Sequence, residues 1–364
     1  MLLIHPFNKA FGLDIGDLSI KLITLQSKWR YKYGHYFEIE ELRSISLPPG
    51  YILNGEILQP EMVRKKILKL LDKTPNKKII KTPWVVANLP ESESFLKIIE
   101  LDIPIDELTD EDVKFQAKKH LPLDLESLYI DWQVIKSKKA DNKKTKIILA
   151  ATKKTNADMY TYLLESVGLT PLALEPEGMA IARAMITAEK DYSGEARMIL
   201  DLGATRSNLI IYDQDSIQFT QNLNFSGEIL TTAIAQELKI EHSKAEKIKI
   251  ENGLLHNPRY PKYIKVVSET TDKLINEMTK ALDFYQGHFE STNQITHITM
   301  CGGSSNLKNL DKILTNKLRI ESAPGKIWKN LMHPNPNYYS QINCMPYAAA
   351  TGLALRAVTY FENS

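Results

Sequence analysis

The sequence has little of what disulfide-bonded, membrane-spanning and nucleic-acid-binding proteins need. Its two cysteines, Cys301 and Cys344, form neither a disulfide framework nor a metal-binding motif. No apolar run approaches the ~20 residues that span a bilayer, and residues 1–10 lack the long apolar segment of a signal peptide. The 46 Lys and Arg residues nearly balance the 44 Asp and Glu residues, whereas nucleic-acid binding requires a basic surface. We therefore expect a cytoplasmic protein that does not bind nucleic acid.

Signatures of several enzyme classes are also missing. The eight histidines are scattered without the spacing of metal ligands. The chain has no H-E-x-x-H motif and no phosphate-binding loop that ends in Gly-Lys-Ser or Gly-Lys-Thr. Hydrolysis of the zinc-protease or P-loop type therefore has no support in the sequence.

What the chain does contain is one short pattern that occurs twice. The first copy spans residues 11–21 around Asp14 and Gly16, and the second spans residues 199–210 around Asp201 and Gly203. Each copy reads as an apolar strand, an Asp, a Gly at a tight turn, a hydroxyl residue and a second apolar strand. Glycine lets such a turn bring backbone N–H groups close to an anion. Two such hairpins facing each other would clamp a phosphate chain, with the Asp carboxylates holding Mg²⁺ through water.

A third glycine turn, Gly302-Gly303, stands between a predicted strand at 295–300 and a predicted helix over 306–317. It would let a flat base or ribose approach the backbone beside a helix N-terminus. Each turn alone fits an ordinary hairpin. Three of them in this order indicate a nucleotide site.

The length and the element pattern predict an α/β protein with two lobes. A chain of 364 residues exceeds the usual size of a single core, and the repeated hairpin implies matching halves. Residues 347–360 are rich in Ala and predict a closely packed C-terminal helix. We divide the chain into a first lobe (1–90, with 171–190 and the helix within 346–361), an inserted subdomain (91–170), the core of a second lobe (191–225 and 295–345) and a helical subdomain of that lobe (226–294).

The order of the three turns resembles the phosphate-1, phosphate-2 and adenosine motifs of the superfamily of actin, Hsp70 and the sugar kinases. Three further stretches carry a closer resemblance: Leu101-Asp102-Ile103-Pro104, Gly168-Leu169-Thr170-Pro171 and Ala245-Glu246-Lys247-Ile248-Lys249. They are similar to the FtsA-related PilM family of type IV pilus assembly, and the resemblance covers residues 11–356. It implies an actin-like (ribonuclease H-like) two-lobed ATPase fold, in which 91–170 is a 1C-like insertion and 226–294 is a 2B-like subdomain.

The resemblance also implies which residues bind ATP and Mg²⁺. The expected nucleotide-binding residues are Asp14, Gly16, Ser19 and Lys21 in the first motif, Asp201, Gly203, Thr205 and Ser207 in the second, Gly302, Gly303 and Ser304 in the third, and Glu246 and Lys249 on a helix. Asp14 and Asp201 would hold Mg²⁺ through water. The spacing of three puts Glu246 and Lys249 on one helical face, which also fits a simple solvent-exposed ion pair.

Two positions depart from the superfamily pattern. Asp17 stands where relatives often place Ser or Thr, and its carboxylate would repel phosphate unless Mg²⁺ lies between them. Arg206 in the second hairpin would offset that charge, so we include both residues among those expected at the nucleotide. Ser226-Gly227 replaces a Gly-Gly pair and changes the local turn.

A hydrolase of this superfamily needs a side chain that orients the attacking water. Glu175 and Glu177 are the acids placed for it, although Glu177 also fits as an N-terminal helix acid. We therefore expect at most a slow ATPase.

The function implied by the resemblance is that of a cytoplasmic ATP-binding scaffold at the inner face of the cytoplasmic membrane, whose nucleotide state sets the lobe angle. Its partner would be the N-terminal peptide of a PilN-type membrane protein, lying in a groove beside the inserted subdomain, so that membrane contact occurs only through this partner. Other pilus platform proteins and a homo-oligomer are further partners compatible with the resemblance. The alternatives are an active ATPase or kinase of the same superfamily, and a filament-forming FtsA-like cytoskeletal protein.

Overall fold

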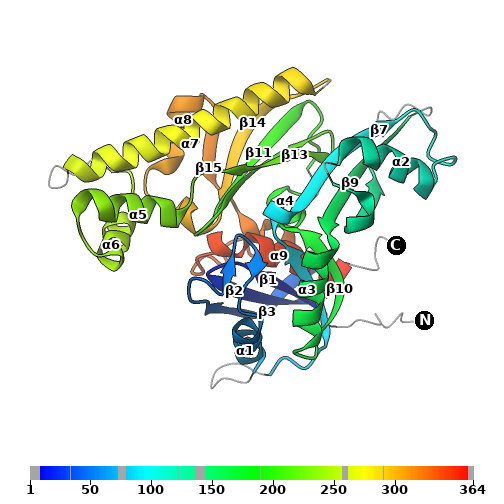
Figure 1. The fold of residues 1–364 in the computed structure, drawn as a ribbon, viewed down its shortest axis with the longest axis horizontal. Coiled ribbons are helices and arrows are strands. Elements are labelled where there is room, and N and C mark those ends of the chain that lie inside the picture. Colours follow the sequence, from blue (N-terminus) through cyan, green and yellow to red (C-terminus); the bar gives the residue numbers. More distant parts are fainter. Residues whose placement is uncertain are drawn as a thin grey trace.

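The computed structural model describes residues 9–32, 34–72, 79–121, 123–135, 144–188, 190–255, 261–289 and 291–359. They form two lobes with a smaller subdomain beside them (Figure 1). Residues 360–361 of the expected C-terminal helix lie outside the described residues. Among the helices of the described ranges, none combines the length and apolar character that crossing a bilayer requires.

The first lobe is built on a five-stranded sheet in the order β10-β6-β1-β2-β3. The strands β1 (Phe11–Ile15), β2 (Ser19–Arg30) and β3 (Gly34–Ser46) pair antiparallel, as expected from their alternating apolar residues. β6 (Trp84–Leu89) pairs parallel with β1, and β10 (Thr170–Pro176) pairs parallel with β6.

The second lobe repeats this sheet, in the order β13-β12-β11-β14-β15. β11 (Glu195–Leu202), β12 (Ser207–Asp213) and β13 (Ser216–Leu223) are antiparallel, whereas β14 (Gln294–Cys301) and β15 (Glu321–Pro324) are parallel to β11. Each copy of the Asp-x-Gly pattern therefore joins the first two strands of its own sheet. This confirms the two matching α/β halves expected from the sequence.

The inserted subdomain is a three-stranded sheet with one covering helix, at the upper right of Figure 1. Its strands β7 (Ser94–Leu101), β9 (Thr145–Lys153) and β8 (Leu128–Val134) lie in that order. The helix α2 (Asp110–His120) starts at a reciprocal cap between Thr109 and Asp112. The subdomain has an apolar core of its own, formed by Ile99, Leu101, Val113, Ala117, Ile147 and Leu149.

Two helices cover one face of the first sheet. α1 (Pro60–Leu71) follows a short hairpin of β4 (Ile52–Leu53) and β5 (Glu56–Ile57). α3 (Lys154–Glu165) buries its apolar side chains in the same core as β1, β6 and α1. Its packing assigns α3 to the first lobe, which shortens the insertion expected over 91–170.

The helices of the second lobe pack on one face of its sheet. They are α5 (Gly227–Leu238), α6 (His242–Asn252), the long α7 (Pro261–His288) and α8 (Leu310–Leu318). Their buried residues and those of β11, β12 and β14 form the largest apolar cluster of the described residues. In Figure 1 α7 runs along the outer edge of this lobe.

Two small-residue helices, α4 (Glu177–Met185) and α9 (Ala348–Thr359), lie between the two large sheets (Figure 1). α4 packs against β11 and β12 of the second lobe and, through Ala180, also against Val86 of β6 in the first. Of the expected first-lobe segment 171–190, the part in β10 belongs to the first sheet, and α4 contacts both lobes. α9 packs against β1 and β2 of the first lobe. A Cβ at Gly352 would lie 1.7 Å from the Ala180 carbonyl oxygen, so only glycine lets the two helices approach this closely.

Candidate functional site

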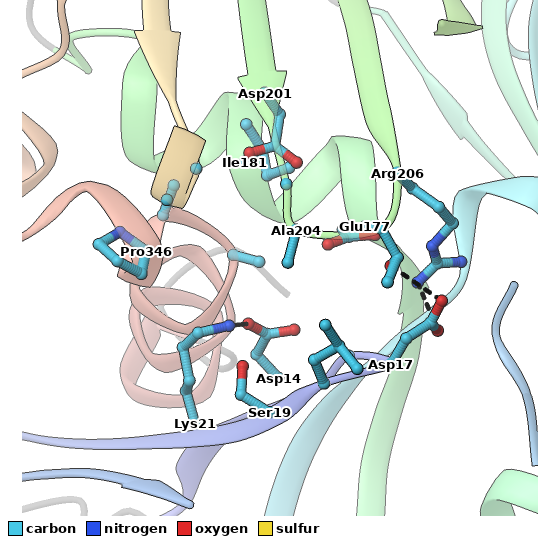
Figure 2. A pocket seen from close by; sticks show the side chains of 18 of the residues that line it. Asp14, Asp17, Ser19, Lys21, Glu177, Ile181, Asp201, Ala204, Arg206 and Pro346 are labelled. Carbon is cyan, nitrogen blue, oxygen red and sulfur yellow. Dashed lines mark hydrogen bonds and ion pairs between the residues drawn. The ribbon is translucent and has the colours of Figure 1, made fainter. Parts of the chain in front are cut away.

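The two Asp-x-Gly turns face one another across a cavity of about 160 Å³ between the lobes (Figure 2). The turns are built alike. The N–H of Gly16 donates to the carbonyl of Ser19 at 3.0 Å, and the N–H of Gly203 donates to the carbonyl of Arg206 at 2.9 Å. Both turns therefore present their backbone to the same space.

Most of the residues expected at the nucleotide line this cavity. They are Asp14, Gly16, Asp17, Ser19, Lys21, Asp201, Gly203, Thr205, Arg206, Gly302 and Gly303, together with Glu177. Ser207, Glu246, Lys249 and Ser304 lie outside its lining, and so does Glu175.

Gly302 brings the third turn against the second hairpin. Its φ is +80°, and a Cβ there would lie 2.4 Å from the Leu202 carbonyl oxygen and 2.6 Å from Asp201 Oδ1. Only glycine fits both this backbone and this contact. The turn therefore closes the wall of the cavity with backbone rather than with side chains.

The same register position in the two hairpins carries different side chains. Asp14 is paired with Lys21, whose Nζ lies 2.8 Å from Asp14 Oδ2, whereas Asp201 is paired with Asn208. Burial acts to lower the pKa of Lys21, but the adjacent Asp14 outweighs it and the pKa is raised. Asn208 is buried, lines the cavity, and has a side-chain oxygen without a hydrogen-bond partner in the described structure. We did not predict Asn208 from the sequence. It occupies the position in the second hairpin that Lys21 occupies in the first, and this correspondence could have identified it.

Burial has the largest effect on the pKa of two further carboxyl groups that line the cavity. It raises the pKa of Glu177 to about 8, against the opposing effect of Arg206. Burial also raises the pKa of Asp201 to about 6, although the Cys301 thiol donates to Asp201 Oδ1 at 3.5 Å. A buried carboxyl group that resists ionisation gains most from a nearby cation.

The lining of the cavity fits a divalent cation with its anion. Four acidic side chains (Asp14, Asp17, Glu177 and Asp201) stand against two basic ones (Lys21 and Arg206). Asp14 and Asp201 point into the space from opposite lobes (Figure 2). No three His, Cys, Asp or Glu side chains of the described ranges come close enough together to ligate one metal ion.

The structure shows that Asp17 joins the two lobes. Its carboxylate accepts hydrogen bonds from the N–H groups of Asn54 and Gly55 in its own lobe, at 3.1 and 3.0 Å. From the second lobe, Thr205 Oγ1 donates to it at 2.9 Å and an Arg206 nitrogen lies 3.4 Å away (Figure 2). Donors from both sides of the cavity therefore converge on one buried carboxylate.

We expect Asp17→Ser to let the lobes separate, because it removes the acceptor shared by both lobes and leaves Arg206 without its ion-pair partner. Small-angle X-ray scattering of the nucleotide-free protein should show a larger radius of gyration. Asp102→Ser, at an exposed position of the insertion, is the matched control. An unchanged radius of gyration for Asp17→Ser would show that Asp17 does not hold the lobes together.

Glu246 and Lys249 lie beside the cavity, near its third turn. Lys249 is buried; its ammonium group lies 2.7 Å from Glu246 and donates to the Gly227 carbonyl at 3.0 Å. Ser304 Oγ reaches the same place, because a Cβ on Gly227 would lie 2.7 Å from it. The pair is therefore part of an inter-element network, unlike a simple solvent-exposed ion pair.

Ser226 and Ser207, both considered from the sequence above, lie at the starts of α5 and β12. Ser226 begins α5, where its hydroxyl accepts from the N–H of Ile229 at 3.2 Å, so the departure from Gly-Gly provides a helix cap. Ser207 is buried at the start of β12, and its hydroxyl has no partner in the described structure. Its position does not support the expected contact with nucleotide.

Glu175 is held away from the cavity by two arginines. Its carboxylate pairs with Arg183, at 2.5 Å and 2.9 Å, and with Arg356 of α9. Burial acts to raise the pKa of Glu175, but the two guanidinium groups outweigh it and the pKa is lowered. This geometry is against a role for Glu175 in orienting water. Of the two glutamates expected for that role, Glu177, the first residue of α4, is the one that lines the cavity.

The nucleotide-free protein should lose stability as pH rises from the ordinary glutamate value of 4.5 towards 8. The folded state keeps the Glu177 proton over this range while the unfolded chain releases it, so rising pH favours unfolding. Glu177→Gln should flatten this part of the thermal-melting profile. An equal slope in both proteins would contradict the raised pKa.

A second cavity, of about 360 Å³, lies where the inserted sheet meets the first lobe. Its lining comes from β6, β8, β9, α3 and β10: Leu89, Tyr129, Ile130, Asp131, Ala150, Ala151, Thr152, Ala157, Asp158, Thr161, Leu174 and Pro176. We call it the insertion groove. β8 and β10 are both edge strands of their sheets, and both contribute residues to the groove.

Comparison with solved structures identifies the fold. The PilM-PilN type IV pilus biogenesis complex aligns with a TM-score of 0.80 and 22% identity, over 97% of this chain and 99% of that one. The ethanolamine utilization protein EutJ from Carboxydothermus hydrogenoformans aligns with a TM-score of 0.56 and 14% identity, over 96% and 90%. MreB 5 of Spiroplasma citri, bound to AMPPNP, aligns with a TM-score of 0.55 and 12% identity, over 98% of each chain. The expected actin-like, two-lobed α/β fold is thereby confirmed.

Comparison of the sequence with family models identifies the family to which the chain belongs. Residues 12–358 match the family model of the type IV pilus assembly protein PilM, which spans nearly the whole chain. This chain therefore belongs to the PilM family of type IV pilus assembly proteins.

Proposed function

We propose that this protein is an ATP-binding scaffold of the type IV pilus assembly platform. It binds Mg·ATP between its lobes and the N-terminal peptide of a PilN-type membrane protein in the insertion groove. That partner holds it at the inner face of the cytoplasmic membrane.

The observation that carries the nucleotide proposal is the pair of matching carboxylate turns on either side of one cavity. Lys21 and the turn N–H groups would contact phosphate, and Asp14 and Asp201 would hold Mg²⁺ through water. Gly302, Gly303 and the Lys249 network would border the adenosine. The bound AMPPNP of the MreB 5 structure, which has the same fold, supports this assignment.

The size of the cavity links nucleotide binding to lobe angle. Its volume of about 160 Å³ is below the ~300–1,000 Å³ of typical small-molecule sites. We therefore propose that the lobes move apart when ATP enters and that the contacts of Asp17 with Thr205 and Arg206 then loosen. Mg²⁺ near Asp17 would reduce the repulsion between its carboxylate and phosphate.

The insertion groove suits an extended peptide. Its volume of about 360 Å³ lies within the usual range for ligand sites. The strands β8 and β10 that border it are edge strands, the kind of element to which an extended peptide adds as a further strand. Its walls are mainly apolar, with Asp131 and Asp158 as the charged residues. A peptide with apolar side chains and a basic residue is the complementary partner. The PilN chain of the aligned complex supports a partner of this type.

The two sites are joined through consecutive residues. Pro176 lines the insertion groove, and Glu177 lines the inter-lobe cavity. The next residue, Gly178, donates its N–H to the buried carboxylate of Glu91 at 2.9 Å, just before β7 of the insertion. A shift of α4 on nucleotide binding would therefore reach Pro176 in the groove and, through Glu91, the start of the insertion, which is the physical basis for coupling.

Turnover measurements distinguish the scaffold from an active enzyme. Glu177 lines the cavity and is our candidate for orienting water, and its raised pKa makes it a poor base at neutral pH. We expect tight Mg·ATP binding in a calorimetric titration together with phosphate release far below the ordinary enzyme range of ~1–10³ s⁻¹. Turnover within that range would instead indicate an ATPase or kinase.

A further inference from the structure

The tip of the β2–β3 hairpin extends beyond the core of the first lobe, whereas Tyr36 on β3 is already buried edge to face against His333. The inner half of β2, up to Leu25, is largely buried, whereas most residues from Gln26 to Arg30 are exposed. Trp29 pairs with His35 and Arg30 with Gly34, so the hairpin remains a regular two-stranded arm out to its tip.

The tip of this arm carries two exposed aromatic residues. Trp29 is 59% exposed and Tyr31 is 94% exposed, and their rings meet edge to face with centroids 6.3 Å apart. An exposed Trp–Tyr pair offers an apolar surface with polar edges, which is the character of side chains at a membrane–water interface.

Basic residues alternate with these aromatics. Lys28, Arg30 and Lys32 occupy the intervening positions, and no acidic residue occurs between positions 26 and 37. The whole chain has a net charge of only +2, so this charge is local to the arm. Each Lys or Arg near an anionic leaflet contributes ~1 kcal/mol of attraction.

We propose that the tip of the β2–β3 arm, residues 28–32, docks on the surface of an anionic bilayer. Trp29 and Tyr31 enter the interfacial region, and the three basic residues contact lipid phosphates. This membrane contact is direct and adds to the one made through the PilN-type partner. This inference rests on the proposed function only in placing the protein at the membrane. There, two weak attachments, one through the arm and one through the partner, together give stable anchoring.

Co-sedimentation with vesicles tests this without nucleotide or partner peptide. The full chain should bind vesicles of equimolar phosphatidylglycerol and phosphatidylethanolamine at low salt, and should bind pure phosphatidylcholine vesicles much more weakly. Trp29→Ser combined with Tyr31→Ser should lower binding about tenfold, and Arg30→Glu should lower it at least fivefold. Tyr162→Ser on α3, at a residue that is 64% exposed, and Lys280→Glu on α7 should leave it unchanged.

Several outcomes would overturn the proposal. The first is that the unsubstituted protein does not bind anionic vesicles. The second is that the arm variants and their controls lose vesicle binding equally. The third is that the arm variants keep vesicle binding but lose affinity for single-stranded nucleic acid. Because no ATP or peptide is present, a negative result here would leave the proposed function intact.

Discussion

Asp14→Asn combined with Asp201→Asn is expected to abolish measurable Mg·ATP binding. Each substitution keeps the shape of the side chain but removes a charge that faces the cavity from one lobe (Figure 2). A contact to a charged group contributes ~1.5–3 kcal/mol, so each single variant should bind about tenfold to a hundredfold more weakly. Isothermal titration calorimetry with Mg·AMPPNP measures this directly.

Asp272→Asn, a half-exposed position on α7 that pairs with Lys317 at 3.4 Å, provides the control for loss of an aspartate outside the cavity. Thermal melting of each variant separates weaker binding from unfolding. Asp201→Asn alone should preserve the fold, because burial already raises the pKa of Asp201. If the double variant retained full affinity for Mg·AMPPNP, the nucleotide would have to bind away from Asp14 and Asp201.

Thr161→Trp is expected to block the partner peptide. Thr161 lies on α3 and lines the insertion groove, so an indole there fills the space that the peptide needs. We expect at least a tenfold loss of affinity, since a bulky group in a binding pocket both removes contacts and clashes. Fluorescence anisotropy with a labelled N-terminal peptide of the PilN-type partner provides the readout.

The matched control is Thr155→Trp, which places the same side chain on an exposed part of the same helix and outside the groove lining. It should bind the peptide like the unsubstituted protein. Equal affinities for both variants would place the peptide site away from the insertion groove. Mg·ATP binding by Thr161→Trp should persist, which would show that the two lobes remain folded.

The repeated hairpins were predictable from sequence because their signal is local. An Asp, a turn glycine and flanking apolar alternation fall within about a dozen residues, and strand pairing across a tight turn follows from them. The third turn was recognisable for the same reason. These three segments define the walls of the cavity and the equivalence of the two halves.

Contacts between distant segments were not predictable in this way. Glu175 pairs with two arginines instead of lining the cavity, and one of them, Arg356, lies 181 residues away in the sequence. Asp17 meets Thr205 across 188 residues, a contact between the lobes that the sequence pattern did not indicate. The assignment of α3 to the first lobe likewise depends on its packing against β1 and α1, because its apolar pattern alone does not specify a partner.

The most direct test of the account is a crystal structure with Mn²⁺ and AMPPNP, in which anomalous scattering locates the metal. We expect one manganese peak in the inter-lobe cavity, bridged through water to Asp14 and Asp201, with the triphosphate between the Gly16 and Gly203 turns. An empty cavity, or a metal–nucleotide complex bound away from both aspartates, would contradict it.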